Sequence, residues 1–348
     1  MTKEITTWFL SNGAALSLLA GEPSAAGPAL TEVTRPKARV VVVENPAAVV
    51  AFTSQLDVVR RMVDRGLITL TGKPTPTAAW HSLVSTQDII GLKVLSAPGS
   101  LTGTRPAVAE AVLQSLRDAG LTSSNIVIWD KHYGHLKTAG FAELGDRYGV
   151  RVAGSAEAGY DTNHFYDSPL PGQLIWGDLE YGQQRPNIGR RSYVSRLVTQ
   201  GMTKIVNLAP LLNHNLTGVS GHLYSLALGS VDNTIRFLNV PGELMLAVPD
   251  IYALPELGDR VVLNITDALV AQYYGEEHSY LHYASILSQL RFGTDPVALD
   301  VLSVRELERQ RELADTPPVK QDLQLYHNAA LIDLGVSDLR DIQVEVLK

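Results

Sequence analysis

The chain has 348 residues, of which 45% are hydrophobic and 19% are charged, so it can bury a sizeable core, either as two α/β lobes or as one domain with an insertion. Its formal net charge of −7 excludes nucleic acid as the main partner, because phosphate binding needs clustered Lys and Arg. It has no cysteine, which excludes disulfides and Cys-held iron–sulfur clusters, and no apolar run reaches the roughly 20 residues of an integral membrane segment.

The first residues resemble an export leader. An apolar stretch, Trp8–Ala20, is followed by a linker rich in Pro, Ala and Gly. Phe9-Leu10 is similar to part of a twin-arginine signal, although Thr6-Thr7 stands where the arginine pair belongs. We interpret residues 1–36 as an altered leader and linker, which predicts an exported, periplasmic protein. The alternatives are an ordinary amphipathic segment and a cytoplasmic protein.

Residues 37–153 alternate between strand and helix patterns and are interpreted as an N-terminal α/β lobe. The spacing of Phe52, Leu56, Val59 and Val63 predicts a helix that ends at Gly66. The other elements expected here are strands at Val40–Val43, Leu92–Leu95 and Ile126–Trp129 and a helix over Pro106–Ala119 that is closed by Gly120.

Residues 154–195 have no clear periodicity but are rich in aromatic side chains, which argues against disorder. We expect a packed lid over a site, with a plain structural insertion as the alternative.

Residues 196–348 return to the alternation and are interpreted as a C-terminal α/β lobe. Asp295-Pro296 predicts the start of a helix, by N-cap and first-turn preference. The strands expected here are Lys204–Asn207, Leu244–Val248, Val261–Ile265 and Ile342–Val346, the last after a helix that ends near Gly335. The whole pattern predicts a mostly parallel, doubly wound sheet with helices on both faces.

The first candidate site is the stretch Asp130–His135, which directly follows a predicted strand. In open α/β sheets, ligands bind beyond the carboxyl ends of the strands. His135 is a candidate acid/base residue, and Asp130 is a candidate to orient a histidine. His132 and His135 are candidate ligands of a divalent metal. A solvated polar loop is the alternative.

The second candidate site follows another predicted strand. His214 is a candidate catalytic residue, while Asn207 and Asn213 are candidates for substrate binding. A hydrogen-bonded turn is the alternative, since Asn and Pro favour turns. His278 and His282 have the i, i+4 spacing of a helical metal pair but lack the order of a zincin motif, so a solvated helix face is the preferred interpretation.

Three blocks of the sequence together resemble the bacterial and archaeal family known as domain-of-unknown-function family 362. They are Thr104–Val108 with the helix to Gly120, Ile205–Val219, and Thr294–Asp300. The resemblance runs from about Val40 to Val346. Asn213 stands where the family usually has lysine, and Ser96-Ala97-Pro98 replaces its usual Lys-Pro-Asn. The resemblance implies an α/β fold and agrees with a leader, since many relatives carry twin-arginine signals.

A looser resemblance is to the nickel-pincer lactate racemase family. There, a Thr-Arg-Pro follows a strand and a Gly-x-His follows the next one; Thr104-Arg105-Pro106 and Gly134-His135-Leu136 occupy such places here. The resemblance implies an acid/base role for His135.

The sequence therefore predicts an enzyme that acts on a small polar substrate with His/Asp acid–base or metal-assisted chemistry, with Arg105 as a further substrate-binding candidate. The alternative is a non-catalytic periplasmic binding protein, in which the aromatic lid and the Arg105 loop hold a sugar or a small anion.

Overall fold

The structure is a computed structural model that describes residues 38–183, 185–238, 240, 242–320 and 322–348. The expected leader and linker over residues 1–36 lie outside the described residues. The described residues belong to one compact unit, and the ranges expected as two lobes contribute strands to the same sheet. Of the helices described, none combines the length and the apolar character needed to cross a membrane.

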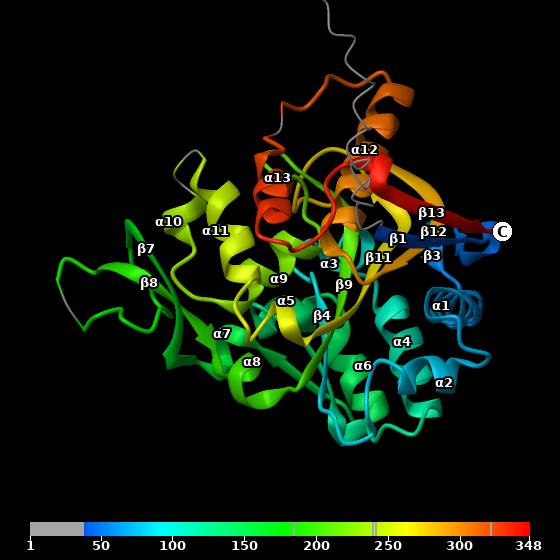
Figure 1. Cartoon of the computed structure of the whole chain (residues 1–348), viewed down its shortest axis with the longest axis horizontal. Coiled ribbons are helices and arrows are strands. Elements are labelled where there is room, and N and C mark those ends of the chain that lie inside the picture. The colour runs from blue at the N-terminus through cyan, green and yellow to red at the C-terminus, as the bar shows by residue number, and fades with distance from the viewer. Residues whose placement is uncertain (1–37, 184, 239, 241, 321) are drawn as a thin grey trace, which may run out of the picture. The chain divides into compact units, whose positions relative to one another are not determined.

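In the described chain, nine strands form one sheet (Figure 1). The order across it is β13 (Ile342–Leu347), β1 (Ala38–Glu44), β12 (Ala284–Gly293), β11 (Val261–Gln272), β9 (Lys204–His214), β4 (Ile90–Val94), β5 (Ile126–Asp130) and β6 (Arg151–Gly154), with β10 (Gly218–Val219) beside β9. Along this path, as far as it is described, only β12 runs antiparallel to its neighbours. The predicted mostly parallel α/β sheet is confirmed.

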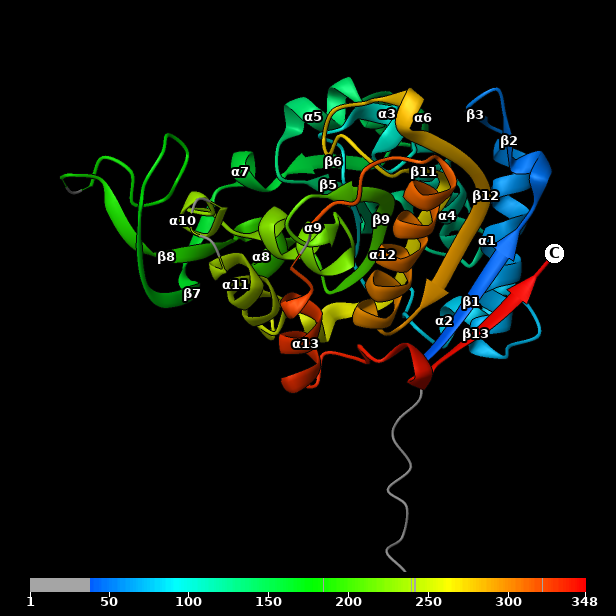
Figure 2. The ribbon, with the colours of Figure 1, turned by 90° about the horizontal axis from the view of Figure 1, so that it is seen from above.

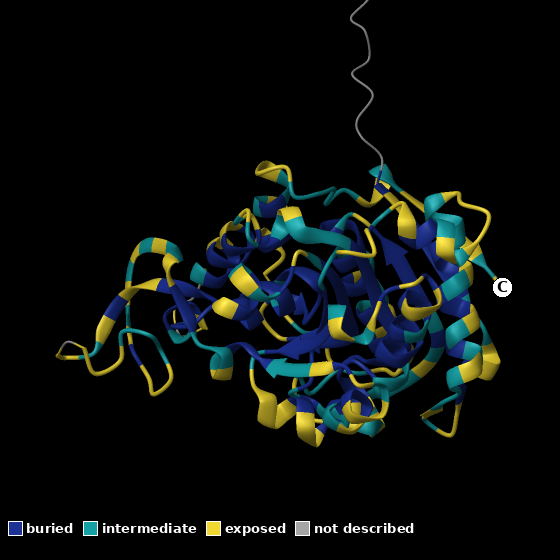
Figure 3. Cartoon of the chain, turned by 90° about the horizontal axis from the view of Figure 1, so that it is seen from below, coloured by how far each residue is buried: buried dark blue, intermediate teal, exposed yellow. Residues whose placement is uncertain are grey.

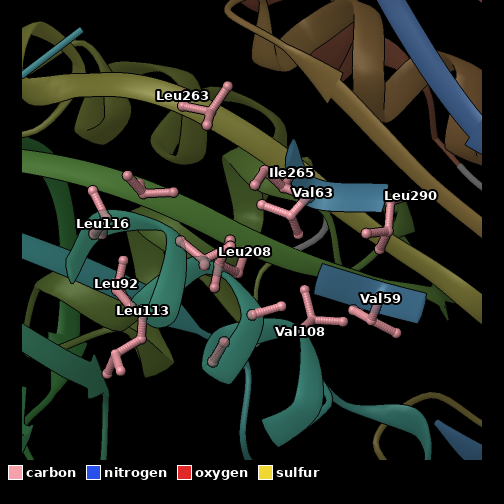
Figure 4. Packing of buried hydrophobic residues seen from close by; sticks show 14 of the residues in the cluster. Val59, Val63, Leu92, Val108, Leu113, Leu116, Leu208, Leu263, Ile265 and Leu290 are labelled. Carbon is pink, nitrogen blue, oxygen red and sulfur yellow. The ribbon is translucent and has the colours of Figure 1, made fainter. Parts of the chain in front are cut away.

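One face of the sheet is covered by α1 (Leu56–Thr71), α2 (Pro76–His81), α4 (Pro106–Asp118) and α6 (Phe141–Tyr148). Figure 4 shows Val59 and Val63 of α1 and Val108 of α4 packed against strand residues that include Leu208 and Ile265. The apolar stripe of each helix is buried because alternate residues of the strands point to this face.

The opposite face is covered by α8 (Arg196–Gly201), α9 (His222–Ser230), α11 (Glu243–Tyr252), α12 (Pro296–Leu313) and α13 (Gln324–Leu331). Figure 2 shows α12 beside α9, between α9 and β12. The predicted cap of α12 is confirmed, because an Asp295 oxygen accepts a hydrogen bond from the Ala298 amide at 2.8 Å. The central strands β4, β5, β9 and β11 are largely buried, whereas exposed residues lie on turns, outer helix faces and the hairpin of residues 160–195 (Figure 3).

Two predicted elements are wrong. The first helix begins only at Leu56 and continues past Gly66 to Thr71, ending at Gly72 in the left-handed conformation. Gly66 lies inside this helix because the Phe292 ring packs against it: a Cβ there would meet Phe292 at 2.2 Å. The sequence shows a glycine at this position, but it does not show that the Phe292 ring of the sheet occupies the space where a side chain would lie.

The segment Leu244–Val248, expected as a strand, lies within helix α11. Most of α11 is buried, and it packs between α9 and α13. A short apolar run that is buried on several sides has no visible period, so sequence cannot distinguish strand from helix there.

Residues 154–195 are not structureless. They contain a hairpin of β7 (Tyr160–Gln173) and β8 (Ile188–Ser195), which lies at the opposite end of the described chain from β13 and β1 (Figures 1 and 2). The remaining short elements are β2 (Val49–Val50), β3 (Thr53–Ser54), α3 (Gly99–Thr102), α5 (Tyr133–Thr138), α7 (Ser155–Ala158), α10 (Ile235–Leu238) and single turns at Pro46–Ala48, Ser123–Asn125, Gly258–Arg260, Leu281–Tyr283 and Leu339–Asp341.

Candidate active site

A pocket of about 220 Å³ lies where β4 and β5 end and α9 crosses the sheet. This is the edge at which parallel sheets bind ligands, because loops from neighbouring strands meet there. Its wall is formed by Leu95, Ala97, Asp130, Lys131, His132, His135, Tyr224, Ser225, Leu228, Gly229, Thr234, Leu238 and Glu277. Among the described residues, none of the expected lid over 154–195 belongs to this wall.

Asp130, in the pocket wall, belongs to a buried ion pair. Lys93 Nζ on β4 lies 2.9 Å from Asp130 Oδ1 at the end of β5, and both side chains are almost fully shielded from solvent. Asp130 Oδ2 accepts hydrogen bonds from the amide and the hydroxyl of Ser96, each at 2.7 Å. Burial acts to raise the pKa of Asp130, but the Lys93 charge and the Ser96 bonds outweigh it and lower this pKa.

Asp130 was expected to orient a histidine. Both of its oxygens instead accept hydrogen bonds from Lys93 and Ser96, and among the described residues no histidine donates to Asp130. Lys93 also donates to Ser225 Oγ at 3.0 Å, so the pair fixes a hydroxyl of α9 at the pocket wall.

Two histidines stand at the mouth of the pocket. His132 precedes the first turn of α5 and His135 lies within it, with their rings edge to face at 5.4 Å. Both are exposed to solvent on one side. Burial, then the neighbouring Lys131 and His135, lowers the pKa of His132, so that its ring is neutral over a wider pH range.

Glu277 reaches the same pocket from the segment between β11 and β12. Burial raises the pKa of its carboxyl, whereas the nearby His135 acts to lower it. The preference for a helix around His278 and His282 is wrong: no α-helix is found in this described segment, and His282 lies in the single turn Leu281–Tyr283. The segment therefore contributes an acid to the pocket rather than a helical histidine pair.

His214, at the end of β9, is buried one layer behind the pocket. Its Nδ1 accepts a hydrogen bond from the Thr217 amide at 3.2 Å, and its ring lies 4.4 Å from the ring of Tyr224, which lines the pocket. Burial lowers the pKa of His214, while Glu276 acts in the opposite direction. Tyr224 thus connects the two candidate sites.

Asn213 and Asn207, on β9, are fully buried and engaged within the protein. Asn213 Oδ1 accepts from the Glu276 amide at 3.0 Å, which anchors the segment that carries Glu277. Asn207 Nδ2 donates to the His222 carbonyl at 3.1 Å and so holds the start of α9. Neither belongs to the pocket wall.

Arg105 is also buried, away from the pocket wall. Its guanidinium lies 2.9 Å from Asp267 Oδ1, its amide donates to Asp267 Oδ2, and its other nitrogen donates to the Leu101 carbonyl at 2.6 Å. These contacts tie the loop after β4 to β11, so the guanidinium already has partners inside the fold.

The expected metal ligands His132 and His135 do not gain a third ligand: within the described chain, no group of three or more His, Asp or Glu side chains is arranged to hold a metal ion. The pocket instead gathers two imidazoles (His132 and His135), two carboxyls (Asp130 and Glu277) and an amine (Lys131). Those are acid–base groups.

Lys93, Ser225, Gly229 and Glu277 were not predicted as site residues. One signal existed for Lys93, because a lysine interrupts an otherwise apolar strand, Ile90–Val94. A lysine inside a buried strand needs a partner, and that partner points to a site.

No protein-family model matches the chain, and no curated protein matches it either. Among solved structures, the chain is similar to the crystal structure of a protein from Thermotoga maritima, with 13% sequence identity and a TM-score of 0.40. The similarity covers 78% of this chain and 60% of the Thermotoga chain, so this chain spans about three fifths of the length of that protein.

Proposed function

We propose that the protein is an enzyme that transfers protons on a small polar substrate, with His135 and Glu277 as the acid/base groups. The observation that carries this proposal is their convergence. One group comes from α5 and the other from the segment after β11, yet both line the same pocket of about 220 Å³. The pocket has room for a small metabolite only.

The electrostatics of Glu277 favour a role as the proton donor. Partial burial against the pocket raises the pKa of Glu277, which favours its protonated form, and the side chains of both Glu277 and His135 remain accessible to a substrate that enters from solvent. The ion pair with Lys93 holds the Asp130 carboxylate in a fixed position in the pocket wall. Membership of domain-of-unknown-function family 362, and export from the cell, remain proposals that rest on the sequence resemblance.

A binding protein for a sugar or a small anion is the second candidate from the sequence. It needs a free Arg105 and an aromatic lid over the pocket. The Arg105 guanidinium is paired with the buried Asp267 carboxylate and is not free to bind an anion, which supports the enzyme over this alternative.

Proton transfer at carbon is tested by incubating the protein in D₂O with small hydroxy acids, keto acids and monosaccharides and measuring deuterium on carbon by mass spectrometry. We expect incorporation into one class of compound, and a loss of roughly 100- to 10,000-fold in His135→Gln and in Glu277→Gln. His282→Gln and Glu312→Gln are matched controls, because both residues are exposed and outside the pocket wall. Incorporation that is equal in all five proteins would refute the assignment.

A further inference from the structure

Lys131 is a pocket residue that the proposed acid–base pair does not use. It directly follows β5, between Asp130 and His132, and its side chain forms part of the pocket wall. Lysine side chains in folded proteins are usually exposed to solvent. The Lys131 side chain is instead half-buried, and its amine lies against the C-terminal end of α9.

The amine has two hydrogen-bond partners among the described residues. They are the carbonyl oxygens of Leu228, at 3.3 Å, and of Val231, both at the C-terminal end of α9. A neutral amine has two hydrogens and one lone pair. When both hydrogens are donated to these carbonyls, the lone pair is left for the pocket, where it can attack an electrophile.

The electrostatic surroundings favour such a neutral amine. Burial lowers the pKa of Lys131 to about 8, and the positive Lys93 acts in the same direction, although Asp232, Asp178 and Asp130 oppose it. An ordinary lysine has a pKa of about 10.4, so near neutral pH the free-base fraction at Lys131 is on the order of a hundredfold larger. Desolvated lysines of this kind are the nucleophiles that form imines.

We propose that Lys131 forms an imine with the substrate, and that the substrate of this pocket is therefore a small aldehyde or ketone. This inference rests on the proposed function and names the chemical class of its substrate. It also explains why an amine and two imidazoles line one small pocket.

The reaction balances without a cofactor. The Lys131 nitrogen attacks the carbonyl carbon to give a carbinolamine, and the hydroxyl leaves as water with a proton that His132, His135 or Glu277 can supply. The carbon–nitrogen double bond then withdraws electrons from the adjacent carbon. A proton on that carbon becomes acidic, and His135 is the group that can remove it and return it.

Reductive trapping tests the imine. The full chain is incubated at about pH 7.5 with pyruvate, glyoxylate or glyceraldehyde and sodium cyanoborohydride, which delivers hydride to the imine carbon and leaves a stable secondary amine. Peptide mapping by mass spectrometry then compares Lys131 with the exposed Lys73 and Lys137 in the same molecule. We expect at least one probe to label Lys131 more than tenfold faster than these two, which is a conservative margin given the difference in free-base fraction.

Labelling at Lys131 that does not exceed labelling at the two exposed lysines, with all three probes, overturns the inference. This comparison uses the unmodified protein, so it holds even if a variant fails to fold. As a second measurement, Lys131→Arg keeps a donor for both carbonyls and should lose carbon deuteration of the carbonyl compounds. If His135-dependent deuteration persists in Lys131→Arg and no adduct forms, the proposed function stands and the imine does not; if neither deuteration nor an adduct is found, both fail.

Discussion

Lys93 Nζ and Asp130 Oδ1 lie 2.9 Å apart on adjacent strands, directly beneath Gly229 of α9. A buried ion pair contributes little net stability against an apolar pair of the same size, but breaking it is costly. Asp130 and Gly229 belong to the pocket wall, so the pair also fixes the position of two wall residues.

The first prediction concerns this pair. Lys93→Met should lower the free energy of unfolding by about 3–5 kcal/mol, because Asp130 is left as an unpaired buried charge. The double variant Lys93→Met/Asp130→Asn should recover much of this loss, because neither buried side chain is then charged. Urea unfolding of the three proteins at neutral pH checks the stability. If Lys93→Met were as stable as the native protein, the buried charge of Asp130 would not need Lys93 as its partner.

The second prediction concerns how closely α9 approaches the pair. A Cβ at Gly229 would lie 2.5 Å from Lys93 Cε and 3.1 Å from its Nζ, so Gly229→Ala should destabilise the protein by about 1–3 kcal/mol. Gly134→Ala in α5 is the matched control, since its added methyl meets no atom within 4 Å. This control should be neutral or stabilising by about 0.4–1 kcal/mol. Thermal unfolding should show a lower melting temperature for Gly229→Ala and an equal or higher one for Gly134→Ala.

The third prediction concerns pH. Asp300 Oδ1 accepts a hydrogen bond from the His222 amide at 2.7 Å. Burial raises the pKa of the Asp300 carboxyl to about 7 and lowers the pKa of the His222 ring to about 3. Between about pH 7 and pH 4 the folded state holds a proton on Asp300 that the unfolded state lacks, so this group adds stability as pH falls. His222 does the reverse below about pH 6.5, because only the unfolded chain binds its proton.

Asp300 and His222 change the stability in opposite directions as pH falls, so replacing either residue shows the contribution of the other. Asp300→Asn should lose more stability than the native protein on acidification from about pH 6.5 to about pH 4. His222→Gln should lose less, or gain. Urea midpoints across this range, compared variant against native protein, cancel the contribution of all other groups. Parallel curves for the three proteins would contradict the assigned protonation states.

The fourth prediction separates structure from binding at Arg105. Arg105→Met leaves the buried Asp267 without its cation and should cost about 3–5 kcal/mol, with unchanged activity per folded molecule. Arg105→Met/Asp267→Asn should regain part of this stability. If activity fell while the unfolding curve stayed the same, Arg105 would be a substrate-binding residue, as the sequence suggested, and not an internal tie.

By itself, the sequence determined the local features of this protein. Short-range periodicity and turn preference, which act within a few residues, predict the alternation of strands and helices and the Asp295 cap of α12. They also predict that Asp130 and His135 lie at the carboxyl end of a strand. These features were sufficient for the mostly parallel α/β sheet and for naming one stretch of the pocket wall.

Only the tertiary structure decided which distant residues meet. Glu277 joins His135, and Lys93 finds Asp130, because sheet order brings the ends of β4, β5 and β11 to one edge and α9 closes over them. The same long-range packing sets Gly66 against Phe292 and turns Leu244–Val248 into a buried helix. Such contacts depend on side chains that are far apart in the chain, so no local pattern contains them.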